Sequence, residues 1–359
     1  MIRPSLTTLL IALAGAALFN LLHIPIPWLL GPMIAVLIAN NSSKLRLAWP
    51  RYVRDIGLVL TGYSMGLSLT RDALVEIGRQ LPSMLLMTVT LVVMCAGTAV
   101  IISRLTGINF PTLMTGSIPG GLTQMITLAE EFPRIDVTIV TLFQVVRLMM
   151  IVIVVPLLLF SPLLGGEHVG GAAAAGSAAA EWPALLSGLP ILLPVCVLGV
   201  ILGKACKLPT AHMLGPMLAA AAAALCGFHG PELPSPLLAF SQLVIGCYVG
   251  LLLQPGKLPH KARTITLALA GGSVLIAVSL VLTWLHSRLH NAAAITSFLS
   301  LSPGGMDQMG LMAHETGADL SIVTSYQTFR LLFIYFAVPP MLKWLFQRME
   351  KREASAGSD

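Results

Sequence analysis

The sequence predicts an all-α polytopic membrane protein made of two inverted-topology repeats, with about 10 transmembrane helices and two helices interrupted at Pro-Gly-Gly. Three observations predict it. Apolar residues make up 56% of the 359 residues and charged residues only 10%, whereas charged residues are about 25% of an ordinary soluble protein. The second half of the chain repeats polar, glycine and proline landmarks of the first half. Lysine and arginine are also distributed unevenly among the predicted loops.

The duplication is visible as three matched motifs. Each motif of the first half recurs 184 positions later: Leu30-Gly31-Pro32 as Leu214-Gly215-Pro216, Gly62-x-x-x-Gly66 as Gly246-x-x-x-Gly250, and Pro119-Gly120-Gly121 as Pro303-Gly304-Gly305. One residue is lost near position 132, and beyond it the spacing is 183. In so hydrophobic a chain, a half-length duplication indicates a repeat-built membrane transporter.

Each half contains six predominantly apolar segments. The longest have about 20 or more residues, enough at ~1.5 Å per residue to cross a ~30 Å hydrocarbon layer. In the first half the segments are 5–22, 28–40, 52–70, 80–103, the interrupted 110–131, and 135–160. In the second half they are 185–206, 213–227, 237–254, 264–287, the interrupted 294–314, and 318–346.

These segments divide the chain into four parts. Residues 1–164 form membrane repeat 1, residues 165–183 a Gly/Ala-rich linker, residues 184–346 membrane repeat 2, and residues 347–359 a charged cytoplasmic tail. The linker composition is typical of flexible connectors. The first 22 residues resemble a secretory signal, but they align with residues 189–206 of the second half, so we expect a retained helix.

The topology follows from the positively charged residues, which are enriched in cytoplasmic loops. If each interrupted segment enters and leaves on one face, each half crosses five times, and sixteen lysines and arginines lie inside with three outside. If these segments cross completely, eleven lysines and arginines lie inside and eight outside. The same eleven-to-eight distribution results if an interrupted helix crosses the membrane and a short segment such as 28–40 does not. The first arrangement is favoured. It places both termini in the cytoplasm and inverts the second repeat.

The two Pro-Gly-Gly elements are the first candidate for a binding site. Proline and glycine interrupt the helical hydrogen bonds, and freed backbone groups in lipid persist only inside protein or along a wet cavity. The N-terminus of the second half-helix then points into the protein, where an anion fits. A pair of structural kinks is the alternative. The substrate-binding residues predicted here are Ser117, Pro119, Gly120, Gly121, Thr123, Gln124, Ser302, Pro303, Gly304, Gly305 and Gln308.

Two arginines form the second candidate. Arg147 and Arg330 lie eleven or twelve residues into the last helix of each half, and Gln144 and Gln327 stand three residues earlier on the same helical face. A charge near the bilayer centre costs at least ~2.5 kcal/mol, which favours a functional or paired role. We predict that these four residues frame one substrate pocket with the two breaks. Alternatively, each arginine caps backbone carbonyls of its neighbouring break without touching a ligand.

Asp307 breaks the symmetry, since Thr123 occupies the equivalent position. A carboxylate in a wet intramembrane cavity is a candidate ion-coupling site for a proton or Na⁺, and a salt bridge to Arg330 is the alternative. Asp136 and Asp319 begin the last helix of each half and are typical helix N-caps.

The remaining features predict no further chemistry. The paired Gly-x-x-x-Gly motifs allow close helix packing, either within one chain or in a homodimer. His286 and His290 lack a third ligand, so we predict no metal site, no cofactor and no enzymatic activity. The five cysteines lie mostly in apolar runs and show no metal-type spacing. The net charge of +6 is explained by cytoplasmic loops and requires no nucleic acid.

The duplicated Leu-Gly-Pro and Pro-Gly-Gly elements and the two Gln-x-x-Arg pairs resemble the AbrB family over nearly the whole chain. This resemblance implies a bacterial inner-membrane protein. The family is labelled as an ammonia monooxygenase and is associated with regulating gene expression. A monooxygenase needs clustered metal ligands, which eight scattered histidines do not supply. The architecture is also similar to inverted-repeat secondary carriers, an analogy at the level of fold.

The sequence therefore predicts a secondary transporter of a small anionic organic solute that works by alternating access in the lipid bilayer. A membrane-embedded regulator or sensor without transport is the alternative.

Overall fold

The structure is a computed structural model, and it confirms the all-α polytopic fold. It describes residues 2–22, 26–42, 47–120, 122–132, 134–159, 161, 182–227, 230–252 and 262–356, which contain helices and no strands. The predicted linker, residues 165–183, lies almost entirely outside the described residues, and so do residues 357–359 of the predicted tail.

Among the residues that the structure describes, the first half of the chain contains seven helices. Several begin at polar caps: the Thr70 side chain accepts a hydrogen bond from the Ala73 N–H and the Asn109 side chain from the Thr112 N–H. The helices are α1 (Ile2–Leu21), α2 (Pro27–Ser42), α3 (Arg51–Leu67), α4 (Arg71–Thr106), α5 (Phe110–Ser117), α6 (Leu122–Glu130) and α7 (Val137–Leu159).

The described part of the second half contains eight helices. Its helices are α9 (Trp182–Ala205), α10 (Ala211–Leu225), α11 (Ser235–Leu252), α12 (Ala262–His290), α13 (Ala294–Leu301), α14 (Met306–Thr316), α15 (Leu320–Phe336) and α16 (Val338–Ala356). The predicted segment 318–346 is divided at Ala337, just before Pro339 and Pro340, which supply no N–H to the helix. Helix α16 also continues past residue 346 to Ala356, through a stretch of strong helix formers, so the predicted boundary of the tail falls within a helix.

Six helical stretches of the described residues are long and apolar enough to cross a membrane, by length and composition. They are Pro4–Leu21, Arg71–Thr106, Val137–Leu159, Gly188–Ala205, Thr264–His290 and Leu320–Met349. Three shorter apolar helices accompany them. Large apolar side chains such as Leu10, Leu86 and Leu202 are more than half exposed, as expected for a lipid-facing surface. The chain is therefore a multi-pass membrane protein, and the full count of ten crossings stays a prediction.

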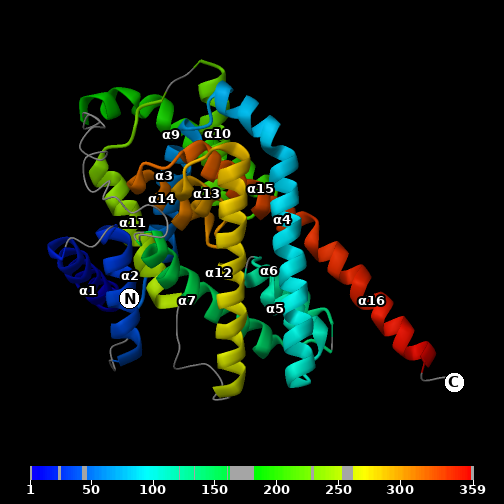
Figure 1. Ribbon diagram of the computed structural model, residues 1–359. Helices are drawn as coiled ribbons and strands as arrows, with labels where there is room; N and C mark the ends of the chain where they lie inside the picture. The colour runs from blue at the N-terminus through cyan, green and yellow to red at the C-terminus, as the bar shows by residue number, and fades with distance from the viewer. Residues whose placement is uncertain are drawn as a thin grey trace.

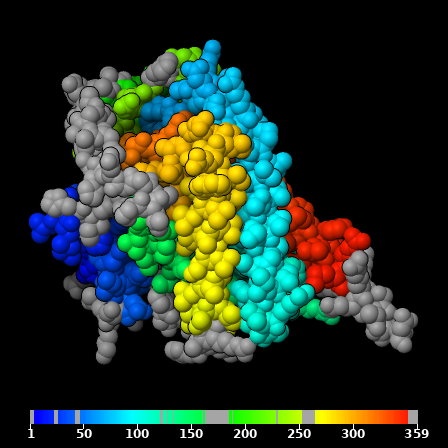
Figure 2. Space-filling model, viewed as in Figure 1, coloured from blue at the N-terminus to red at the C-terminus, as the bar shows by residue number. Residues whose placement is uncertain are grey.

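Helices α4 and α12 run in opposite directions. Figure 1 shows that, followed from N- to C-terminus, α4 runs from the top of the view to the bottom, whereas α12 beside it runs from the bottom to the top. The two helices are in contact and form one face of the molecule (Figure 2). Helices α5 and α6 lie in the lower part and α13 and α14 in the upper part, so the two interrupted segments start from opposite ends.

The Gly-x-x-x-Gly motifs join the two halves within one chain. A Cβ atom at Gly62 would lie 2.2 Å from the Met213 oxygen of α10, and one at Gly246 would lie 2.6 Å from the Leu29 oxygen of α2. Gly66 and Gly250 make the same kind of approach one turn later, to the oxygens of Met217 and Met33. The partner that the sequence left open is thus the other half of the same chain, since α3 packs on α10 and α11 on α2.

The first helix is an integral part of this packing. A Cβ atom at Gly15 would meet the Gly31 oxygen at 2.4 Å, and one at Gly199 would meet the Gly215 oxygen at 2.6 Å. The same glycine contact therefore joins α1 to α2 and α9 to α10. The N-terminal segment thus packs as a helix on α2, and its retention stays a prediction.

We expect Gly62→Ala to destabilise the protein by about 1–3 kcal/mol, because overpacking forces the backbone of α3 away from α10. Gly78→Ala is the matched control, since it also lies in a helix but a Cβ atom there meets nothing within 4 Å. That substitution should be neutral or stabilising. Thermal unfolding of the purified proteins in detergent measures the difference, and equal melting temperatures for the two variants would contradict this packing.

Candidate functional site

Both predicted interruptions are present. Helix α5 ends at Ser117 and Ile118 is extended, with φ −67° and ψ 130°, before α6 begins at Leu122. Helix α13 ends at Leu301 and Ser302 is extended, with φ −60° and ψ 131°, before α14 begins at Met306. Pro119 and Gly120 lie in the first break and Pro303, Gly304 and Gly305 in the second, while Gly121 lies outside the described residues.

Arg147 binds the carbonyl end of the first break. Its Nη1 donates to the Ile118 oxygen at 2.6 Å and lies 3.5 Å from the Ser117 oxygen. Its Nη2 donates to Gln144 Oε1 at 2.7 Å. The Gln144 Nε2 in turn donates to the oxygens of Thr115 and Ile118, each at 3.0 Å. One glutamine and one arginine thus satisfy carbonyls that the interruption leaves without helical partners.

Arg330 makes the equivalent contacts in the second break. Its Nη1 donates to the Ser302 oxygen at 2.6 Å and its Nη2 to the Gly304 oxygen at 3.0 Å and to Gln327 Oε1. The Gln327 Nε2 donates to the oxygens of Leu299 and Ser302 at 2.6 and 3.1 Å. Leu299 and Ser302 stand 184 positions after Thr115 and Ile118, so the two Gln-x-x-Arg pairs hold corresponding carbonyls.

These contacts show the capping arrangement that the sequence left as an alternative. A cation at the carbonyl end of α5 and of α13 is also favoured by the helix dipole. Capping does not use the whole guanidinium, however, because the buried Arg147 Nε has no hydrogen-bond partner among the described residues.

The two arginines are buried close to one another. Arg147 is 5% exposed and Arg330 7% exposed, and the positive charge of Arg147 acts on Arg330. Within the described residues neither arginine forms a salt bridge. Two buried like charges without a carboxylate partner are electrostatically costly, and a bound anion would reduce that cost.

A small cavity adjoins this site. It is lined by Ser117, Arg147, Thr98 and Cys95, among others, and its volume is about 20 Å³. That volume holds about one water molecule. The site is therefore closed to an organic solute in this conformation.

The first break also contacts α15 of the second half, and the second break contacts α7 of the first half. A Cβ atom at Gly120 would lie 3.3 Å from Ile334 of α15, and one at Gly304 would lie 3.1 Å from Ile151 of α7. Gln124 Nε2 donates to the Tyr335 oxygen at 2.8 Å, a carbonyl that Pro339 leaves without its helical partner. Gly120, Gln124 and Gly304 thus lie at the junction of the halves, whereas the Thr123 side chain lies outside what the structure describes. In the second break, Ser302 Oγ and Gln308 Oε1 are buried without partners among the described residues.

Asp307 lies beside the second break, as predicted, but its charged neighbour differs from the alternative considered. A Cβ atom at Gly305 would lie 2.5 Å from Asp307 Oδ1, so the carboxylate lies over the break. The cation whose charge acts on it is Arg54 of α3. Asp307 and Arg330 form no salt bridge among the described residues.

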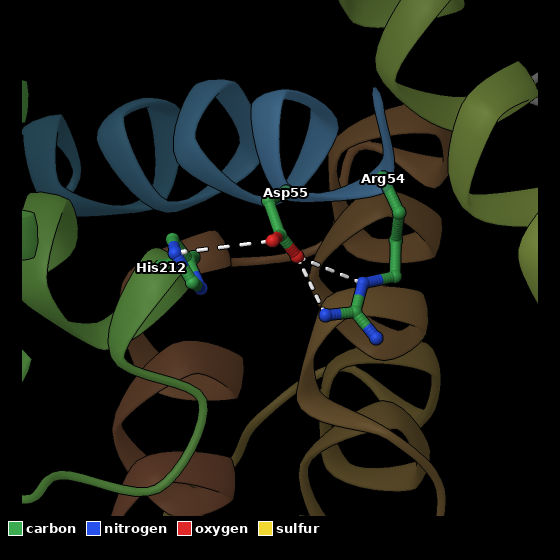
Figure 3. A network of polar contacts seen from close by, with 3 residues as sticks. All are labelled: Arg54, Asp55 and His212. Carbon is green, nitrogen blue, oxygen red and sulfur yellow. Dashed lines mark hydrogen bonds and ion pairs between the residues drawn. The ribbon is translucent and has the colours of Figure 1, made fainter. Parts of the chain in front are cut away.

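Arg54 belongs to a polar cluster that the sequence analysis missed (Figure 3). Arg54 Nε and Nη2 lie 3.0 and 2.5 Å from Asp55 Oδ1, and Asp55 Oδ2 lies 3.9 Å from His212 Nε2 of α10. The guanidinium also lies 4.4 Å above the Tyr248 ring. The signal in the sequence was the lack of duplication: the positions equivalent to Arg54, Asp55 and His212 are Leu238, Ala239 and Trp28.

The predicted N-caps and histidine pair are structural. Asp136 Oδ1 accepts from the N–H groups of Thr138 and Ile139, and Asp319 Oδ1 accepts from those of Ser321 and Ile322, which confirms the caps. His286 and His290 hydrogen-bond to Ser297 and Ser83. No group of three or more His, Cys, Asp or Glu in the described part of the chain could hold a metal ion.

Comparison with known proteins places the chain in a family. Residues 28–346 match the AbrB family, described as transition state regulatory protein AbrB. The chain belongs to the AbrB family. The match includes both Pro-Gly-Gly breaks and both Gln-x-x-Arg pairs, and so confirms the resemblance noted from those motifs.

Two relatives match this AbrB-family chain almost end to end. A protein of Escherichia coli (strain K12) named "Putative regulator AbrB" is 26% identical over 336 residues, which is 94% of each chain. A protein of Bacillus subtilis (strain 168) named "Uncharacterized protein YhjN" is 24% identical over 373 aligned positions, covering 97% of this chain and 96% of the relative. Neither name states an enzymatic activity.

Proposed function

We propose that this protein is a secondary transporter of a small anionic organic solute, with its substrate site between the two Pro-Gly-Gly breaks and Arg147 and Arg330. The observation that carries the proposal is that both guanidinium groups are buried and that neither has a carboxylate in salt-bridge contact among the described residues. A carboxylate of the substrate is the natural counter-ion, and the Arg147 Nε, which has no hydrogen-bond partner among the described residues, can donate to it.

The solute reaches this site by alternating access, in which the site opens to one side of the membrane at a time. The cavity beside Arg147 holds about one water, so the solute enters only after the halves move relative to each other. The contacts of Gly120 with Ile334 and of Gly304 with Ile151 place each break against a helix of the other half. Relative movement of the halves would therefore open the site, as in transporters built from inverted repeats.

We infer that the two repeats have inverted topology in a bacterial inner membrane, with both termini in the cytoplasm. The opposite directions of α4 and α12 (Figure 1) support this orientation, and so does the sixteen-to-three distribution of lysine and arginine. A cysteine introduced into residues 165–183 should react with an impermeant thiol reagent from the outside. Reaction only from the cytoplasmic side would contradict the inverted arrangement.

Asp307 is the proposed coupling site for a proton or Na⁺. It lies at the second break, and the cation that acts on it, Arg54, is paired with Asp55 in the same polar cluster. All of these residues lack charged counterparts in the other half. The asymmetry supports the proposal, because a coupled transporter must treat the ion differently in its two orientations.

A membrane-embedded regulator or sensor is the second candidate, and it is favoured by the word regulator in the names of the family and of the E. coli relative. Such a protein would bind the solute at the same site without moving it across the membrane.

The experiment that tests the proposal has two steps. Small mono- and dicarboxylates, with amines of equal size as controls, are first screened for binding to the purified protein by calorimetry. A radiolabelled carboxylate that binds is then tested for counterflow in proteoliposomes. Binding with counterflow supports a transporter and binding without flux supports a sensor. Failure of every carboxylate to bind would contradict the anion site.

A further inference from the structure

A second cavity, lined mainly by apolar side chains, lies where the first half of the chain meets α16. Its volume is about 230 Å³. Sites that enclose a whole small ligand are larger, at about 300–1,000 Å³, so an occupant of this cavity extends beyond it. The rings of Phe132 and Phe346 meet edge to face, with their centroids 5.6 Å apart, and hold α16 to the cavity. The apolar residues of the lining are Phe110, Pro111, Phe132, Ile135, Phe346 and Met349.

The cavity lies at a surface of the membrane. One wall, residues 109–111, follows the end of α4, and a second, at Phe132, precedes the start of α7. The third wall, at Phe346 and Met349, ends the stretch Leu320–Met349. This stretch, α4 and α7 are each long and apolar enough to cross a membrane. Because their ends meet at the cavity, it lies at the boundary between hydrocarbon and water, at the level of the lipid headgroups.

Arg134 adds a positive charge to this lining. The Asn109 side-chain amide donates to the Arg134 backbone oxygen, which joins the first wall to the second. The carboxylates nearest to Arg134 in the sequence are engaged: Glu131 Oε2 lies 2.5 Å from Lys343 Nζ, and Asp136 Oδ1 accepts from two N–H groups at the start of α7. The cavity therefore favours a ligand with an apolar part and a negatively charged part.

The outer face of α16 places lipid next to the cavity. Leu342 and Phe346 of this helix are buried, whereas Met341 is 44% exposed and Trp344 58% exposed. The Arg348 guanidinium lies 5.2 Å from the centre of the Trp344 ring. Figure 1 shows α16 running outward from the body of the molecule towards the C-terminus. Tryptophan and basic residues on one exposed helix face are typical of the membrane–water interface.

The duplicated framework does not require this lining. The positions equivalent to Asn109 and Phe110 in the second half are Ala293 and Ala294, and the position equivalent to Arg134 is Gly317. The helical arrangement that both halves share therefore forms without the aromatic ring and without the arginine.

We propose that this cavity binds one anionic phospholipid of the bilayer, with its phosphate at the Arg134 guanidinium and the upper part of an acyl chain against Phe110, Phe346 and Met349. Basic pockets between membrane helices are suited to such headgroups. A zwitterionic phospholipid fits less well, because its headgroup carries a cation that Arg134 repels. The site is separate from the arginine site at the breaks and does not depend on the transport proposal.

The test is native mass spectrometry of the full-length protein, in a non-ionic detergent, with equal amounts of dioleoylphosphatidylglycerol and dioleoylphosphatidylcholine. These lipids share their acyl chains and differ in headgroup charge. We expect the wild type to retain the anionic lipid about fivefold over the zwitterionic one. Arg134→Gln should retain both equally, and Arg134→Lys should keep most of the preference. Arg104→Gln is the control, because Arg104 is exposed in the last turn of α4 and outside the lining, and it should behave as the wild type does.

Two further measurements test the apolar part of the site. A large excess of glycerol 3-phosphate, which has the phosphate but no acyl chains, should not displace phosphatidylglycerol. Met349→Glu should reduce retention of phosphatidylglycerol several-fold, because it places a carboxylate in the apolar lining. Arg134 is exposed, so its substitution should leave the fold intact, and melting temperatures verify this. Equal retention of both lipids by the wild type, an unchanged preference in Arg134→Gln, a lost preference in Arg104→Gln, unchanged retention by Met349→Glu, or displacement by glycerol 3-phosphate would each overturn the proposal.

Discussion

Arg147→Ala and Arg330→Ala are each expected to weaken binding of the anionic solute at least about thirtyfold. Removing one partner of a buried, hydrogen-bonded charge pair costs about 2–5 kcal/mol, and every ~1.4 kcal/mol is tenfold in affinity. The remaining arginine cannot compensate, since each guanidinium is held at its own break by carbonyls. Calorimetry with a carboxylate from the binding screen measures the loss.

Lysine should restore little of this affinity. Arg330 holds the oxygens of Ser302, Gly304 and Gln327 with two nitrogens of one planar group. An ammonium is a compact point donor that cannot reproduce that fork. We therefore expect Arg330→Lys to resemble Arg330→Ala in binding, although it preserves the charge.

A structural control separates loss of binding from loss of the fold. Thr112 Oγ1 accepts from the Asp136 N–H at 3.0 Å, and Thr296 Oγ1 accepts from the Asp319 N–H at 3.1 Å. Thr112→Val keeps the shape of the side chain but removes the acceptor of the part-buried Asp136 N–H, at a cost of about 1 kcal/mol in stability. It should bind the anion normally. Equal losses of stability and binding in Thr112→Val and Arg147→Ala would make the arginines purely structural.

Much of this site could be predicted because its features follow from short sequence patterns. Proline and glycine locate both breaks, and an aspartate with Thr or Ser two residues later locates both helix starts. The spacing of three between Gln144 and Arg147 places them on one face of the helix. These features depend on residues close together in the sequence, so they can be predicted without knowledge of the tertiary packing.

Contacts between the halves could not be predicted in the same way. The glycine motifs predict a close helix neighbour, but spacing cannot say that Gly62 meets Met213 rather than another chain. Asp307 and Arg54 are far apart in the sequence, and only the packing of α14 against α3 brings them into range. Arg330 was the nearer cation in sequence, yet its Nη atoms donate to Ser302, Gly304 and Gln327, and it forms no salt bridge with Asp307 among the described residues.

The role of Asp307 is the point at which transport and binding can be separated. We expect Asp307→Asn in proteoliposomes to exchange substrate across the membrane without an ion gradient but to fail to concentrate it when a gradient is applied. Asparagine preserves the size and a hydrogen-bonding oxygen but cannot change its charge. Exchange requires only the substrate site and the conformational change, whereas accumulation requires an ion that binds the two orientations differently.

The asymmetry of the protein makes this expectation specific to one residue. Thr123, at the equivalent position of the first break, cannot titrate, and the Arg54 that acts on Asp307 is replaced by Leu238 in the second half. Glu232→Gln is the control, since Glu232 is an exposed carboxylate and its loss should leave accumulation unchanged. If Asp307→Asn accumulates substrate as the wild type does, Asp307 serves only to balance the charge of Arg54, and the coupling ion must bind elsewhere.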